Sequence, residues 1–117
     1  MGMFPAWRIA MLEMQDPFGW HKIDEKILHR IRERLKDFES MTWNQIIGQD
    51  SHLIPRTDLC TDAQRKLTQL KQDDVDEVFS LRITGKERVF GIWEAGILRL
   101  LWWDPEHKIC PSPKKLT

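Results

Sequence analysis

The strongest constraint on the fold is a change in the spacing of apolar residues near Val78. From that residue on, apolar and polar side chains alternate with a period of two, which is typical of β-strands. The pairs Gly85-Lys86 and Ala95-Gly96 interrupt the alternation and are typical of tight hairpin turns. The pattern therefore predicts a three-stranded meander within residues 78–110, with strands at 78–84, 88–93 and 97–103. The third strand is apolar on both faces except at Arg99, so we expect it to be central in its sheet.

Upstream of this meander, apolar residues recur at helical spacing. Asp24 stands where it can cap the first helical segment, and Thr42 with Gln45 forms a capping-box pattern before the second. Thr61 with Gln64 repeats that pattern before the third. These signals predict helices at 24–41, 43–48 and 61–71. The remaining segments are predicted to be a first strand at 7–15, a polar loop at 49–57 and a tail at 111–117.

The order of one strand, three helices and three strands predicts an α+β fold, with an antiparallel sheet that carries its helices on one face. The chain of 117 residues, 41% hydrophobic and 31% charged, has the size and composition of one globular domain over residues 1–117. No apolar run is long enough to cross a bilayer, so we expect no membrane association. Cys60 and Cys110 form no CxxC motif, which favours free thiols in a reducing, cytoplasmic environment.

The sequence lacks the motifs of several common kinds of functional site. The sequence has no GxxxxGK[ST], GxGxxG or GxSxG pattern, which argues against phosphate-loop, dinucleotide-binding and serine-hydrolase chemistry. His107 and Cys110 have the spacing of a ligand pair but supply only two of the four ligands that a structural zinc site needs. The chain has no tyrosine, which excludes phenolic acid–base catalysis. We therefore expect no metal and no other cofactor.

The remaining candidate chemistry lies in a cationic group on the meander and the segment that follows it. Residues 82–117 hold 7 Lys/Arg against 4 Asp/Glu, whereas residues 1–81 hold 11 against 14. Arginine presents a planar pair of donors to phosphate oxygens, and histidine transfers protons near neutral pH. Because RNA supplies its own 2′-hydroxyl nucleophile, these groups predict metal-free phosphodiester cleavage. The residues are Arg82, Lys86, Arg88, Arg99, His107, Lys108, Lys114 and Lys115.

Two questions stay open at this level. With a two-residue loop, Arg82 and Arg88 point to opposite faces of the sheet, whereas a one-residue bulge brings them to the same side. Trp102 and Trp103 adjoin the cationic segment and could stack on unpaired bases. A tryptophan pair on a central strand is more often part of the core.

Residues 78–109 resemble the C-terminal half of the RelE/HigB-like toxins of the RelE/ParE superfamily. The similarity lies in a strand that ends at Arg82, in the segment 85–92, and in a final apolar strand that closes on residues 104–108. The predicted order of elements is similar over nearly the whole chain. Residues 16–21 and 102–107 also resemble segments of small bacterial proteins without an assigned role.

This resemblance implies a RelE-like fold and a toxin of a toxin-antitoxin system that cuts mRNA, ribosome-bound in most of the family, without metal. Arg88 and Arg82 would bind the scissile phosphate, and His107 would act as general acid or base. Lys86, Lys108, Lys114 and Lys115 would bind RNA. The implied partners are RNA and a cognate antitoxin, with a homodimer left open.

One branch of the superfamily keeps the fold, lacks the nuclease residues and binds DNA gyrase. The alternative is therefore a non-enzymatic protein-binding module, either a degenerate toxin or an inhibitor of a larger enzyme. The net charge of zero and the six tryptophans favour this alternative, because tryptophan often anchors protein interfaces.

Overall fold

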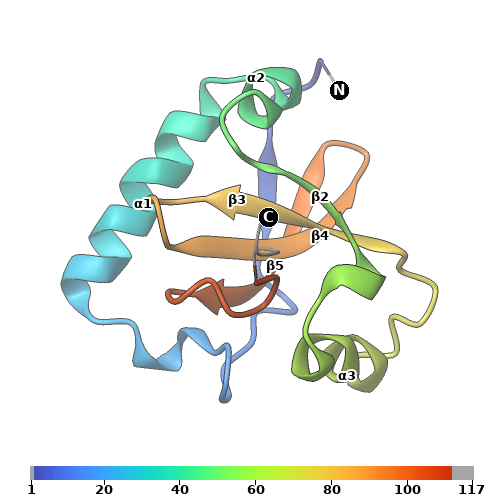
Figure 1. Cartoon of the computed structure of the whole chain (residues 1–117). Helices are drawn as coiled ribbons and strands as arrows, with labels where there is room; N and C mark the ends of the chain where they lie inside the picture. Colours follow the sequence, from blue (N-terminus) through green and yellow to red (C-terminus); the bar gives the residue numbers. More distant parts are fainter. Residues whose placement is uncertain (1, 112–117) are drawn as a thin grey trace, which may run out of the picture.

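A computed structural model describes residues 2–111 as a sheet packed with helices (Figure 1). The helices are α1 (Glu25–Glu39), α2 (Trp43–Ile47) and α3 (Thr61–Gln69). The strands are β1 (Ala6–Arg8), β2 (His52–Pro55), β3 (Glu77–Arg82), β4 (Arg88–Glu94) and β5 (Ile97–Asp104). Single 3-10 turns lie at Trp20–Lys22 and Arg56–Asp58. Each α-helix lies inside its predicted range.

The five strands form one mixed sheet in the order β1-β5-β4-β3-β2. β3, β4 and β5 form the predicted antiparallel meander, and β2 extends it antiparallel to β3. β1 pairs in parallel with β5, with Ala6 opposite Ile97 and Arg8 opposite Arg99. The prediction of a purely antiparallel sheet is therefore wrong at this edge. β5 is an interior strand, paired on both sides, although β4 is the middle strand of the sheet.

Two strand boundaries also differ from the prediction. Only Trp7 and Arg8 of the predicted strand at 7–15 belong to the observed strand, which begins at Ala6. The chain turns at Ile9, whose carbonyl accepts a hydrogen bond from Leu12 N at 3.0 Å. Part of the predicted polar loop at 49–57 is β2, which pairs with β3 and buries Ile54. Met11 and Leu12, which follow β1, thus pack against the core clusters instead of extending the sheet.

Helices cover both faces of the sheet, so the prediction that they lie on one face is wrong. Phe79 of β3 packs in one cluster with Ile31 and Phe38 of α1. Its neighbour Val78 points to the opposite face and packs in a second cluster with Leu67 of α3. Figure 1 accordingly shows α1 and α3 on two sides of the strands. A sheet with apolar side chains on both faces needs cover on both.

A β-bulge between β4 and β5 decides which side chains of β5 face α3. Gly91 of β4 pairs with Leu100 of β5. The preceding residue, Phe90, pairs with Trp102, which leaves Leu101 as an extra residue in β5. A bulge of this kind shifts the alternation of the following residues by one. Trp102 therefore joins Phe90 in the cluster below α3.

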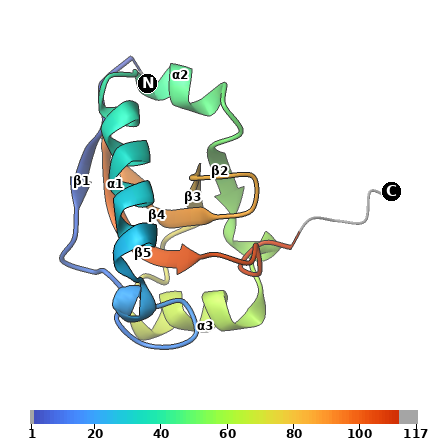
Figure 2. The same cartoon turned by 90° about the vertical axis from the view of Figure 1, so that its left-hand side faces the viewer.

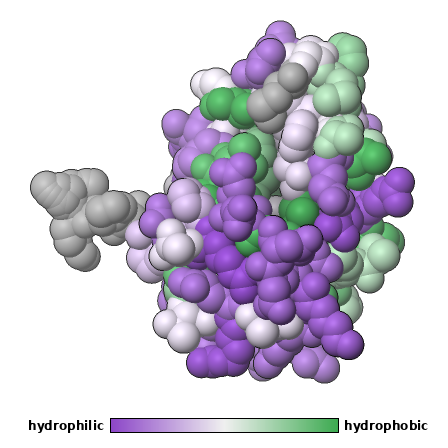
Figure 3. Space-filling view, turned by 90° about the vertical axis from the view of Figure 1, so that its right-hand side faces the viewer, coloured by the Kyte–Doolittle hydropathy of each residue, from purple (hydrophilic) through white to green (hydrophobic). Residues whose placement is uncertain are grey.

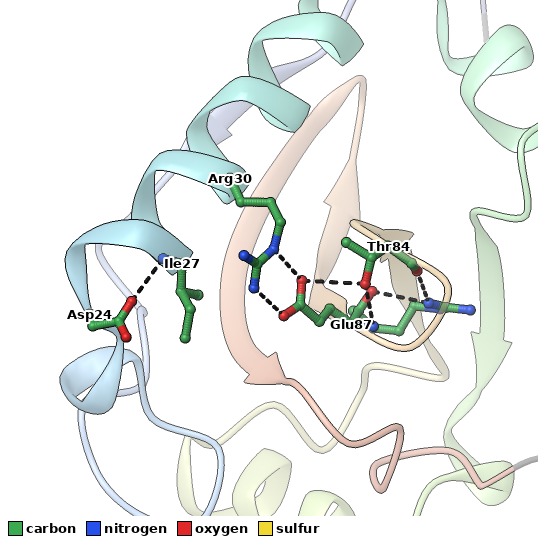
Figure 4. A network of polar contacts seen from close by, with 6 residues as sticks. Asp24, Ile27, Arg30, Thr84 and Glu87 are labelled. Carbon is green, nitrogen blue, oxygen red and sulfur yellow. Dashed lines mark hydrogen bonds and ion pairs between the residues drawn. The ribbon is translucent and has the colours of Figure 1, made fainter.

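Local capping signals predicted two of the three helix starts. The side chain of Asp24 accepts an amide hydrogen bond from the first turn of α1 (Figure 4), and Thr42 forms the predicted capping box of α2. The capping box predicted for α3 is wrong, because Thr61 is already helical and Cys60 is the N-cap. No helix within residues 2–111 has both the length and the apolar character needed to span a membrane.

Candidate active site

The β3–β4 hairpin brings Arg82 and Arg88 to the same face of the sheet. They are direct register partners, and such partners point to the same side. Ile83 N donates to Glu87 O at 2.9 Å, so the loop spans residues 84–86 and is one residue longer than the predicted pair. This extra loop residue resolves the question that the sequence left open.

An ion pair holds this hairpin against α1 (Figure 4). Arg30 donates to both carboxylate oxygens of Glu87, from Nε at 2.9 Å and from Nη2 at 2.5 Å. The hydrogen bond to Glu87 raises the pKa of Arg30. Glu87 N also donates to Thr84 Oγ1 at 3.2 Å. The bidentate geometry fixes the loop that leads directly into Arg88.

Arg88 stands in the middle of a charged row that crosses three strands. Its register partners are Arg82 on β3 and Asp104 on β5. Burial lowers the pKa of Arg88, and the positive charge of Arg82 lowers it further. Nη1 of Arg88 donates to the carbonyls of Thr84 at 2.7 Å and Glu87 at 3.0 Å. Its Nε and Nη2 have no hydrogen-bond partner within residues 2–111, so two donors are available for an anion.

A pocket of about 310 Å³ opens beside this row. His52 lines it from β2, where it is the register partner of Ser80. His107 lines it from the loop that follows β5. The complete lining is Asp50, His52, Ile54, Ser80, Arg88, Phe90, His107, Cys110 and Pro111. Two imidazoles and one guanidinium thus share a single hollow. No group of three His, Cys, Asp or Glu in the described part of the chain is placed to hold a metal ion.

The loop that carries His107 is fixed by a buried carboxylate. Asp104 is only 2% exposed and accepts from Lys108 N and Ile109 N, both at 2.9 Å. His107 itself has a left-handed backbone, with φ of 59°, which residues other than glycine seldom adopt. The two amide hydrogen bonds next to it hold the loop in this conformation. Asp104 is therefore a positioning residue for His107.

We expect Asp104→Ala to lower the free energy of unfolding by about 2 kcal/mol, because two backbone amides lose their acceptor. Urea denaturation followed by tryptophan fluorescence measures this change. Asp104→Asn keeps one acceptor oxygen and serves as the milder control. An alanine variant as stable as the parent would show that the carboxylate does not hold the loop.

Arg82 lies next to Arg88, but its guanidinium is already engaged in an ion pair. Its Nη1 forms an ion pair with the carboxylate of Asp50, which lines the pocket. The backbone N–H of Arg82 also donates a hydrogen bond to Ser51 Oγ, directly before β2, at 2.9 Å. Arg82 thus adds positive potential near Arg88, while part of its charge is balanced by Asp50.

The predicted RNA-binding lysines that the structure describes lie outside the pocket. Lys86 Nζ lies 3.9 Å from Glu106 Oε1 across an exposed pair of side chains. Lys108 is exposed on the loop after β5. Neither lysine lines the pocket. Lys114 and Lys115 lie outside the described residues.

Sequence analysis did not identify His52 as part of the site. His52 and Ile54 are two residues apart in β2 and both line the pocket. Four residues are too few for an alternating pattern to predict a strand. The interpretation of Trp102 and Trp103 as core residues is confirmed, because they are 0% and 5% exposed. Neither can stack on a base.

Comparisons of the chain with protein-family models, with curated proteins and with solved structures found no match. The functional proposal therefore rests on the pocket geometry and on the sequence resemblance.

Proposed function

We propose that the pocket binds single-stranded RNA and cleaves its phosphodiester bonds without a metal, as a RelE-like toxin. The observation that carries the proposal is that Arg88, His52 and His107 line one hollow. Because the nucleophile belongs to RNA, the protein needs to supply only orientation, stabilisation of the phosphate charge and two proton transfers. The three side chains match these needs.

In the proposed reaction, one imidazole accepts the proton of the 2′-hydroxyl as its oxygen attacks the adjacent phosphorus. The bond from phosphorus to the 5′-oxygen breaks, and the second imidazole, in its protonated form, donates a proton to that oxygen. The products are a 2′,3′-cyclic phosphate and a 5′-hydroxyl. Nε and Nη2 of Arg88 donate to the phosphate oxygens while their negative charge increases.

The size of the pocket limits what can enter it. A volume of about 310 Å³ is near the lower end of the range for small-ligand pockets. It suits one nucleotide of a flexible single strand and not a duplex. The net charge of zero means that attraction of RNA is local, around Arg88 and Arg82, instead of arising from the whole surface.

Replacing His107 with glutamine is expected to lower the cleavage rate constant about 100-fold, because one proton transfer loses its group. The measurement uses 5′-labelled single-stranded RNA in excess EDTA, with detection of the 2′,3′-cyclic phosphate end. His29→Gln is the matched control, since His29 is exposed on α1. His52→Gln should lower the rate to a similar degree.

The substrate itself provides a second test. RNA with a single 2′-deoxy sugar at the cleavage position should resist cleavage there and still bind. Cleavage at that position would contradict the attack by the 2′-oxygen. If the parent protein cuts neither free RNA nor message in a translation extract, the proposed nuclease is wrong and a non-enzymatic binding module is favoured.

The toxin part of the proposal predicts that induced synthesis of the protein arrests growth with loss of intact mRNA. Synthesis of the His107→Gln variant should leave growth and message intact. Growth arrest that persists in this variant would separate toxicity from cleavage and favour inhibition of a larger enzyme.

A further inference from the structure

A hollow larger than the proposed active-site pocket lies elsewhere on the described surface. It has a volume of about 450 Å³ and runs between α1 and the segment around β1, which lie side by side in Figure 2. One wall consists of apolar side chains of α1 and the other of residues near β1. Those used in the argument are Leu28, Ile31 and Leu35 on α1, and Trp7, Ile9 and Leu12 near β1.

The rim of this apolar groove is unusually exposed. Ile9 is 69% and Leu28 is 54% exposed, although most large apolar side chains of the chain are covered. Figure 3 shows the opposite side of the molecule, where hydrophilic residues dominate the surface around α3. A local concentration of exposed apolar residues beside a hollow is typical of an interaction surface.

The charged residues along the groove indicate which charge a bound partner would carry. Two cations, Arg32 and Lys36, and one carboxylate, Glu39, line the groove. Both cations pair with Glu33, at 2.9 Å and 3.5 Å, on the exposed helix surface. Exposed pairs of this kind are weak, so an incoming carboxylate can replace or share them. Glu39, at one end, is occupied by a hydrogen bond from Trp7 Nε1 at 2.8 Å.

We propose that this groove binds an amphipathic helix of a partner protein, with acidic residues on both sides of its apolar stripe. The groove follows α1 from Leu28 to Glu39, which corresponds to about 16 Å or three helical turns. A helix of that length presents apolar anchors at i, i+4 and i+7. Leu28, Ile31 and Leu35 offer the complementary apolar wall. This binding site is independent of the proposed nuclease pocket.

The test uses three synthetic helical peptides of about 14 residues. The first carries leucines at i, i+4 and i+7 with glutamates beside them. The second has lysine in place of every glutamate, and the third has the composition of the first with its leucines dispersed around the helix. Fluorescence anisotropy of the labelled peptides with the full chain measures binding. The acidic amphipathic peptide is expected to bind at least about tenfold more tightly than the other two.

Variants of the full chain locate the binding. Leu28→Glu places a negative charge on the rim and should weaken binding of the acidic peptide at least about tenfold. Met14→Glu is the matched control, because Met14 is 55% exposed but does not line the groove. Both substitutions change exposed side chains, so both variants should unfold at the parent's urea midpoint.

Three results would overturn the proposal: no binding of the acidic peptide, equal binding of the dispersed peptide, or equal loss in both variants. Sedimentation of the chain alone adds a fourth. A dimer that Leu28→Glu dissociates would show that a second copy covers the groove. RNA cleavage by the parent and by Leu28→Glu should be equal, so failure of this proposal and failure of the nuclease are distinguishable.

Discussion

Replacing Arg88 with alanine is expected to lower the rate constant of RNA cleavage about 10³-fold, which is the loss seen when a preorganised donor to a developing oxyanion is removed. The guanidinium is half-buried, and its orientation is set by the bonds from Nη1 to two carbonyls of the hairpin. The guanidinium therefore does not have to change its orientation when the phosphate gains negative charge. The measurement is single-turnover cleavage of labelled RNA in EDTA.

Two further variants make this result specific. Arg88→Lys keeps the charge but loses the planar pair of donors, so its rate should fall between those of the parent and the alanine variant. Arg65→Ala removes an exposed arginine of α3 that pairs with Asp62 and should leave the rate unchanged. If the Arg88→Ala and Arg65→Ala variants both cleave RNA as fast as the parent, the pocket is not the active site.

Replacing Gly91 with alanine is expected to lower the free energy of unfolding by about 3 kcal/mol, near the upper end for overpacking. A Cβ atom at this position would lie 2.5 Å from Arg99 O and 2.9 Å from Leu98 Cγ. The first atom belongs to the backbone of β5 and cannot rotate away. The strands would have to separate at the bulge. Urea denaturation measures the change.

Gly48→Ala is the control for this substitution. Gly48 has a φ of −69°, and its added Cβ would lie no closer than 3.5 Å to its nearest neighbour. We expect its free energy of unfolding to stay within about 1 kcal/mol of the parent's. A Gly91→Ala variant that matches this control would contradict the close approach of β4 and β5. It would also question the bulge that places Trp102 and Asp104 on the α3 side.

The parts of the fold that were predictable depend on local interactions. Asp24 and Thr42 bond to amides a few residues away, so the helix starts follow from the sequence alone. The meander strands are joined by short turns and are also local. The edge strands were not predictable, because the pairing of β1 depends on residues near Ile97 and that of β2 on residues near Val78. Neither partner can be identified from the short edge segment.

The candidate site also combines features that the sequence predicted with features that depend on distant contacts. Arg88 and His107 were found from residue type, and both line the pocket. The shared face of Arg82 and Arg88 depends on one additional loop residue, which Gly85-Lys86 gave no reason to expect. His52 joins the pocket only because β2 pairs with β3. Helices on both faces were missed because the face that each helix covers depends on contacts between residues far apart in the sequence, such as Ile31 with Phe79 and Leu67 with Val78.

β5, which lies between β1 and β4 in the sheet, is also the last strand of the described residues along the chain. While the protein is being synthesised, β1 has no strand partner and β4 can pair only with β3 until β5 leaves the ribosome, so folding of the nascent chain is completed late. A product that terminates within β5 lacks Asp104 and His107 and has an open sheet.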